Sequence, residues 1–246
     1  MATALRTLPG RRSGRSRSVL FAGAVTLVVI AAAVACGGLG SSGQSTAAYE
    51  PVWSPDGRSI AFVVDPDASA PCPYGACVFG YQVWVMRANG ERARMLGGGE
   101  SAAWSPDGRR LVIEAPWADI YTIRADGTGR QRLTQLGDVR HPVWSPDGKQ
   151  LAFVHYTHTD DPDKAYELYL INADGSGRRR LTRLDGDEPA WSPTGPIAFT
   201  TFEGLYTINP DGHKLKKLFS SSLIGPYTDS APIAWSPDNS LTRPSM

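Results

Sequence analysis

The feature that most constrains the fold is a five-residue motif that returns along the chain. The sequence Trp-Ser-Pro-Asp-Gly occupies residues 53–57, 104–108 and 144–148, and altered copies begin at Trp191 and Trp235. Successive tryptophans lie 51, 40, 47 and 44 residues apart. A repeat of this length indicates tandem copies of one small structural unit, each packing against its neighbours.

Each unit carries strand signals in a constant order. After the Trp motif, an apolar or β-branched run occurs at residues 60–63, 111–113, 151–154 and 197–199, and the next run occurs at 81–86, 120–123, 168–171 and 205–208. These later runs end near hairpin signals, which are Asn89-Gly90, Asp126-Gly127, Asp174-Gly175 and Asp211-Gly212. A short closing strand follows at residues 94–96, 132–134, 180–182 and 217–219. Four strands in each repeated unit predict an all-β fold, in which each unit forms one four-stranded blade of a β-propeller.

The Trp motif has a mechanical interpretation. Pro presets φ, Asp accepts hydrogen bonds from turn amides and Gly takes the left-handed conformation, so the motif reverses the chain between two strands. The preceding Trp is then expected to lie between neighbouring sheets, which stabilises each contact by about 2–3 kcal/mol. The alternative is a ring of carboxylates that binds cations, from Asp56, Asp107, Asp147 and Asp238. Thr194 replaces the Asp in the fourth copy, which favours turn capping.

The complete repeated pattern resembles a known family. Pro-x-Trp-Ser-Pro-Asp-Gly, Ile/Leu-Ala-Phe, Ile/Leu-Tyr-x-Ile/Met-x-x-Asp-Gly and Arg-Leu-Thr are similar to the WD40-like repeat of TolB-type β-propellers, over residues 49–240. The resemblance implies a binding platform in the periplasm or on the cell surface. Similar blades also form the gating propeller of prolyl oligopeptidase relatives, but this chain has no room for the hydrolase domain.

The first 35 residues have the composition of a signal peptide. Five arginines, at positions 6, 11, 12, 15 and 17, precede an uncharged stretch of 17 residues, 19–35, which fits a signal better than a typical membrane span. The end of this stretch and Cys36 resemble a bacterial lipobox, which implies a lipid on Cys36. Ordinary signal cleavage and an uncleaved anchor are the alternatives. Residues 36–48 are small and polar and predict a flexible tether before a domain at residues 49–246.

Two further cysteines, Cys72 and Cys77, are separated by four residues. In an oxidising compartment outside the cytoplasm, such a pair can close a small disulfide loop. Free or metal-bound thiols remain the alternatives, although two thiols alone make a poor zinc site. We expect the disulfide.

The charge balance argues against nucleic acid as a partner. Removing the five N-terminal arginines leaves 20 Lys and Arg against 24 Asp and Glu, a net charge of −4. A protein that binds a polyanion has the opposite balance.

Two units carry extra residues between their second and third strands, at residues 65–80 and 156–167. Equivalent loops of a propeller project from one face, so these insertions predict a recognition surface for a protein or glycan partner. The second insertion and its flank contain candidate ligands for a divalent metal, which are His155, His158, Asp160, Asp161 and Asp163. The alternative is a set of solvated polar residues in a loop.

The sequence contains no Gly-x-Ser-x-Gly elbow, His-Glu-x-x-His motif or Gly-Lys-Ser/Thr phosphate loop. We therefore expect a binding scaffold that needs no cofactor, with an envelope enzyme or enzyme accessory of the hydrolase type as the alternative.

The fifth Trp-Ser-Pro-Asp, at Trp235, is followed by only a few residues, and Pro244 interrupts its expected second strand. The prediction is four complete blades and a partial fifth. Such a chain can close an unusually small ring or form an open arc that self-associates through its exposed blade edge. A truncated gene product is a third reading.

Overall fold

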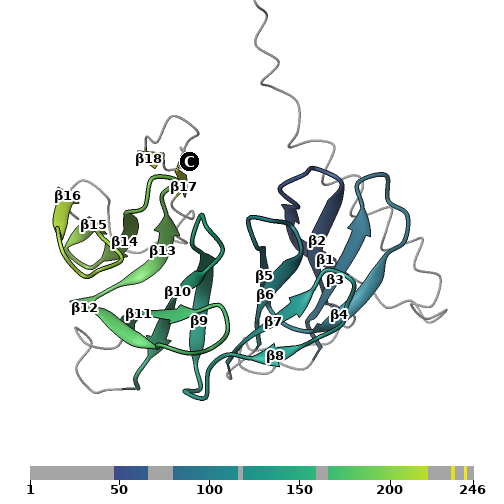
Figure 1. Cartoon of the computed structure of the whole chain (residues 1–246), viewed down its shortest axis with the longest axis horizontal. Helices are drawn as coiled ribbons and strands as arrows, with labels where there is room; N and C mark the ends of the chain where they lie inside the picture. The colour runs from purple at the N-terminus through teal and green to yellow at the C-terminus, as the bar shows by residue number, and fades with distance from the viewer. Residues whose placement is uncertain are drawn as a thin grey trace, which may run out of the picture.

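The computed structural model describes residues 47–65, 80–115, 119–158, 166–220, 234–235 and 241–242. Every regular element in these segments is a β-strand, which confirms the predicted all-β fold (Figure 1). No helix in the described segments is both long enough and apolar enough to cross a membrane.

The strands form four antiparallel sheets of four strands and one hairpin. The first sheet contains β1 (Ala47–Trp53), β2 (Ser59–Asp65), β3 (Gln82–Arg87) and β4 (Arg94–Gly98). The second contains β5 (Ser101–Trp104), β6 (Arg110–Glu114), β7 (Ile120–Arg124) and β8 (Gln131–Arg132). The third contains β9 (Val139–Trp144), β10 (Gln150–Tyr156), β11 (Tyr166–Asn172) and β12 (Arg179–Asp185). The fourth contains β13 (Asp187–Trp191), β14 (Ile197–Thr201), β15 (Gly204–Ile208) and β16 (Lys216–Ser220), and the hairpin pairs β17 (Ala234–Trp235) with β18 (Leu241–Thr242).

Successive sheets meet through their first strands. β1 contacts β5, β5 contacts β9, β9 contacts β13 and β13 contacts β17, so these strands are innermost and β4, β8, β12 and β16 are outermost. The sheets follow one another around an arc, which does not close into a ring among the described strands (Figure 1). Four complete blades and a partial fifth are therefore present, as the repeat predicts.

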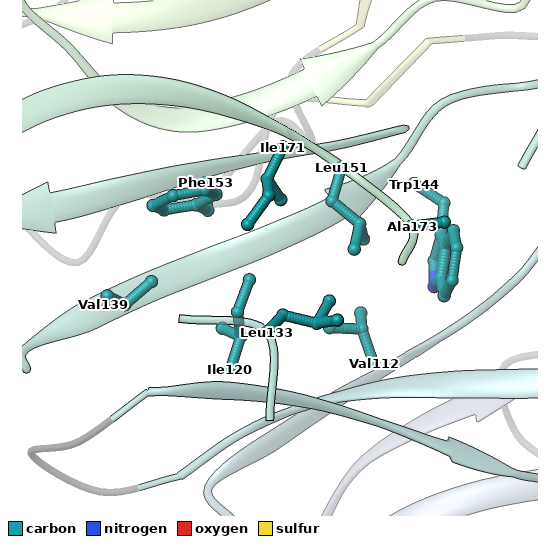
Figure 2. Close-up of a cluster of buried hydrophobic side chains, with 9 residues drawn as sticks. All are labelled: Val112, Ile120, Leu133, Val139, Trp144, Leu151, Phe153, Ile171 and Ala173. Carbon is teal, nitrogen blue, oxygen red and sulfur yellow. The ribbon is translucent and has the colours of Figure 1, made fainter. Parts of the chain in front are cut away.

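The hydrophobic core lies between adjacent blades. Figure 2 shows one such layer, in which Leu151, Phe153 and Ile171 of the third sheet face Ile120 and Leu133 from the second blade. Alternating side chains along each strand point to opposite neighbours. On β10, for example, Leu151 and Phe153 pack toward the second sheet while Ala152 and Val154 pack toward the fourth. Each blade thus needs a neighbour on both faces.

The Trp motif forms the predicted self-capped turn. In the second copy, the Ser105 hydroxyl donates to Asp107 Oδ1 over 2.6 Å, and the amide of Arg109 donates to the same oxygen over 3.0 Å. The first and third copies repeat both bonds through Asp56 and Asp147. These carboxylates serve the turn, while Asp238 lies outside the described residues.

The fourth copy shows why Thr194 replaces the aspartate. The amide of Ser192 closes this turn on the carbonyl of Pro196, four residues on, whereas Ser105 reaches the carbonyl of Arg110, five residues on. The position that supplies the capping amide elsewhere is here Pro196, which has no N–H. A carboxylate at position 194 would lack its backbone donor.

Two kinds of contact recur at the boundaries between blades. At the inner side, the indole of Trp104 donates to the Val52 carbonyl, Trp144 to Ala103 and Trp235 to Ala190, over 3.1, 3.2 and 3.0 Å. At the outer side, Leu96 of β4 packs on the Gly127 hairpin and Leu133, just after β8, packs on the Gly175 hairpin, while the backbone carbonyl of Leu181 on β12 faces Gly212. Four of the motif tryptophans pack against a neighbouring blade as expected, whereas Trp53 belongs to a cluster within the first sheet. Trp144 is as buried as the core, at 7% exposed.

Candidate functional site

The two faces of the arc differ chemically, and we name them the turn end and the loop end. The turn end carries the Trp motifs and the Asp-Gly hairpins, and its aspartates are engaged locally: Asp126 accepts from Thr128, Asp174 from Ser176 and Asp211 from the His213 amide. The loop end is where the second and third strands of each sheet are joined and where each first strand begins. The insertions predicted as a recognition surface, residues 65–80 and 156–167, begin at the loop end, where Asp65 ends β2 and Tyr156 ends β10, while residues 66–79 and 159–165 lie outside the described residues.

Charged side chains from four blades and their connections gather where the innermost strands start at the loop end. We name this group the inner mouth; its members are Glu50, Glu100, Glu114, Asp138, Arg140, His141, Asp187 and Glu188. Six of the eight are acids, so the inner mouth is electronegative.

His141 joins three blades within the inner mouth. Its backbone amide on β9 donates to Glu114 Oε2 at the end of β6 over 2.9 Å, and Ser101 on β5 donates to the same oxygen over 3.1 Å. Its ring Nδ1 lies 2.9 Å from Asp187 Oδ1 on β13. The second, third and fourth sheets are therefore linked by polar contacts as well as by apolar packing.

The innermost strands carry unusual backbone at equivalent positions. Glu50, His141 and Glu188 have φ values of 48°, 51° and 48°, in the left-handed region that residues other than Gly rarely adopt. Each stands three residues before a motif tryptophan and directly before a proline, and each lies where the strand register shifts. This bulge holds the backbone in a conformation that costs on the order of 1 kcal/mol or more a residue. The repeated strain places one polar side chain from each of three innermost strands at the inner mouth.

Burial and crowding shift the acid–base behaviour of this group. Burial raises the pKa of Glu114 and of Glu50, and the neighbouring Glu114 charge adds to the rise at Glu50. Burial alone would lower the pKa of His141, but its hydrogen bond to Asp187 and the charges of Asp187, Glu114 and Glu188 outweigh burial and raise it. Burial would likewise raise the pKa of Asp187, but His141 and the amide of Glu188 hold it below its usual range. The structure thus favours a His141–Asp187 ion pair.

Further contacts of the inner mouth centre on Asp138. Asp138 Oδ1 lies 2.9 Å from Arg140 Nε, and Asp138 Oδ2 lies 2.8 Å from His158 Nε2. The ring of Tyr156 meets the edge of His158, with centroids 4.5 Å apart, and lies 5.1 Å from the ring of Tyr166 across the strand pair. Aromatic and charged side chains therefore flank the second insertion.

The structure gives no support to the candidate metal site. His158 contacts Asp138, whereas His155 packs edge-on against Tyr169, so the two imidazoles engage different partners. Asp160, Asp161 and Asp163 lie outside the described residues. Within the described segments, no three His, Cys, Asp or Glu side chains are grouped so that they could hold a metal ion.

A pocket of about 500 Å³ opens beside the inner mouth, between the first and second sheets. Tyr49 and Glu50 of β1, Val63 of β2, and Tyr81 and Glu100 line it. The rings of Tyr49 and Tyr81 meet edge to face with centroids 6.3 Å apart.

Sequence reasoning predicted a recognition surface at the loop end, which stays a prediction, and it missed the inner mouth. A charged residue or histidine directly before Pro-x-Trp, at Glu50, His141 and Glu188, is a signal that could have found it. The predicted lipid site Cys36 and the predicted disulfide partners Cys72 and Cys77 lie outside the described residues and stay predictions.

Comparison with solved structures finds related folds. TolB from Acinetobacter baumannii aligns with a TM-score of 0.54 at 19% identity, over 74% of this chain and 45% of that one. An oligogalacturonate lyase in complex with manganese aligns with a TM-score of 0.57 at 13% identity, over 82% and 61%. An acylaminoacyl peptidase from Pyrococcus horikoshii aligns with a TM-score of 0.53 at 12% identity, over 72% and 33%. The chain thus spans less than two thirds of each of these proteins, and at such identities the likeness shows the fold alone.

The matching family model settles the relationship. No curated protein matches the chain by sequence. The model described as the TolB beta propeller domain matches residues 41–195, which is more than half of the chain. This match covers four of the five Trp motifs, and each complete blade of this protein is a four-stranded antiparallel sheet. The chain therefore belongs to the TolB β-propeller domain family.

Proposed function

We propose that this protein is an exported scaffold of the cell envelope, anchored by a lipid on Cys36, that binds a protein or glycan partner at its loop end without catalysing a reaction. TolB-like propellers are envelope proteins, which supports export and a binding role at a coarse level. The observation that carries the proposal is the contrast between the ends: the turn end caps its own aspartates, while the loop end gathers charged and aromatic side chains around a pocket.

The contacts of the inner mouth support a binding role rather than a catalytic one. His141 and Asp187 pair with each other across a blade boundary, and Ser101 donates its hydroxyl to Glu114. These groups hold neighbouring blades in register. Preformed polar groups fixed on strands suit recognition, because little side-chain order is lost when a partner binds.

Photocrosslinking in cells tests where the partner binds. A photoreactive amino acid replaces Phe202, exposed at the loop end, or in a matched variant Arg109, exposed at the turn end. We expect crosslinked adducts from position 202 and not from position 109. Digestion of the adduct with protease or glycosidase then distinguishes a protein from a glycan. Adducts from position 109 alone, or equally from both, would contradict the proposal.

Metabolic labelling with a clickable fatty acid tests the anchor. The parent protein should acquire the label and sediment with membranes, and the Cys36→Ser variant should do neither, because the acylated thiol is absent. A Cys77→Ser variant serves as the control and should label like the parent. Label that persists in Cys36→Ser, or that is missing from the parent, would refute lipid anchoring at this residue.

A further inference from the structure

The pocket between the first two sheets combines two kinds of surface. The rings of Tyr49 and Tyr81 form an aromatic corner, and Tyr49 is 41% exposed. Val63, which is 2% exposed, belongs to the buried layer between these sheets. The carboxylates of Glu50 and Glu100 complete the lining. A matching ligand therefore has an apolar or planar portion and a positively charged group that can lie beside two carboxylates.

The two carboxylates have no cation of their own among the described residues. Arg140 pairs with Asp138 and His141 pairs with Asp187, so the cations of the inner mouth are engaged by other acids. Burial raises the pKa of Glu100 and of Glu50, and each is raised further by neighbouring carboxylates, although Arg140 partly offsets this at Glu100 and His141 at Glu50. Holding these charges close together in a partly buried pocket costs free energy, which a bound cation would reduce.

The chemistry of the lining discriminates between cations. A guanidinium or ammonium group binds over an aromatic face within about 6 Å of the ring centroid, and its alkyl stem packs on apolar surface. Carboxylates receive the N–H donors of such a group in strong, charge-assisted hydrogen bonds. A metal ion would require more oxygen ligands, and no group of three acids or histidines is placed for it in the described segments. The negative charge also disfavours an acidic glycan.

We propose that this pocket is a recognition site for a lysine or arginine side chain of a partner polypeptide, held between the Tyr49–Tyr81 corner and the carboxylates of Glu50 and Glu100. The inference rests on the proposed binding role of the loop end and adds the chemical class of the group that is bound. The bulge in β1 sets the backbone position from which Glu50 lines the pocket, independently of any ligand.

Selection from a random dodecapeptide library tests the proposal, with the full chain in detergent micelles as the target. Selected peptides should contain a lysine or arginine, and replacing that residue by norleucine or citrulline, which lack the charge, should weaken binding by about tenfold or more. Recovery of no peptide, or of peptides whose binding does not depend on a basic residue, would overturn the proposal.

Variants of the protein locate the site. The double variant Glu50→Gln, Glu100→Gln should bind the selected peptides with an affinity lower by about tenfold or more. Glu91→Gln with Glu203→Gln removes the same charge from exposed positions outside the pocket and should change the affinity by less than about twofold. Equal losses of affinity in the two double variants would show a general effect of charge and would contradict the assignment of the binding site to this pocket.

A third variant guards against misfolding. Tyr49→Ser removes an exposed ring of the pocket without opening the core. This variant should also bind the peptides with lower affinity, while its far-ultraviolet circular dichroism is unchanged. Unchanged affinity in this folded variant would argue against the aromatic corner. If crosslinks form at position 202 but no basic peptide binds, the recognition site fails while the proposed function stands; if neither is seen, both fail.

Discussion

Asp107 illustrates how a single side chain fixes a turn. It accepts from the Ser105 hydroxyl and from the Arg109 amide, and these hydrogen bonds lower its pKa. In each of the three full motifs, the carboxylate accepts from the amide two residues further on. At position 194, where Pro196 stands two residues further on, a carboxylate would lack this amide donor and would keep only the Ser192 hydroxyl.

Replacing Asp107 by alanine should therefore destabilise the protein by about 1 kcal/mol, because two local hydrogen bonds are lost. Thr194→Asp, which restores the consensus motif, should give no stabilisation. Urea denaturation followed by tryptophan fluorescence measures both changes. A clear gain in stability from Thr194→Asp would contradict the explanation from Pro196.

The His141–Asp187 pair should make stability depend on pH. The pKa of His141 is raised above 6.5 in the folded state, so its contribution is fully present below the unfolded pKa of about 6.5 and is lost as the pH rises through the folded pKa. The difference in unfolding free energy between the parent and His141→Asn should be larger at about pH 5.5 than at about pH 8.5. Because the imidazole is 45% exposed, we expect a change of only about 0.5 kcal/mol.

Asn suits the positive φ at this position, so the variant tests the charge rather than the backbone. Asp187→Asn should remove the same pH dependence, because it removes the partner that raises the pKa. A difference that stays constant between the two pH values would show that the ion pair does not contribute.

At the scale of single blades, the burial of each blade's outer leucine depends on the blade that follows it. Leu96, Leu133 and Leu181 are 8%, 7% and 6% exposed because each lies in the apolar layer shared with the following blade. Their counterpart on the fourth blade, Leu218, is only partly buried and packs against the cluster of Ala190, Ala198 and Leu205 in its own blade. The interface of the fourth blade with β17 and β18 therefore has the inner indole contact but lacks the outer leucine contact among the described residues.

The same substitution should consequently have different effects in the two blades. Leu133→Ala should cost about 2–3 kcal/mol, since it leaves a cavity under the Gly175 hairpin. Leu218→Ala should cost about 1 kcal/mol or less, since much of its surface is already in water. Thermal and urea unfolding measure both values, with Leu181→Ala as an internal standard that should match Leu133→Ala. Equal costs at 133 and 218 would mean that another part of the chain covers Leu218.

At the scale of the whole molecule, the described blades form an arc with two ends. Proteins built from stacked repeats gain stability from each interface, so an end that lacks a neighbour offers a surface for another blade. A contact between unlike ends of two copies is heterologous and can continue to further copies unless the rotation closes a ring. Self-association through such an end stays a prediction.

Light scattering coupled to size-exclusion chromatography tests this expectation. The mass should rise with protein concentration, and Leu218→Glu should reduce the effect, because it places a charge on the side of β16 that a further blade would cover. Phe219→Glu is the control: the side chain is 52% exposed and alternates to the opposite side of the strand, so it should leave association unchanged. A constant monomer mass at all concentrations would contradict self-association.

The sequence by itself determined the blades. The turns and hairpins depend on residues within about six positions of one another, so Ser-Pro-Asp-Gly and Asp-Gly predicted their places and hence the order of the strands. Only the tertiary structure decided the inner mouth, because Glu114 and His141 are 27 residues apart and His141 and Asp187 are 46 apart, and they meet only when blades curve around a common centre. His155 and His158 are close in sequence, yet the third blade gives them different partners, while the other candidate metal ligands lie outside the described residues and that site stays a prediction. Local chemistry repeats with the motif, whereas a site formed between repeats depends on how the repeats pack.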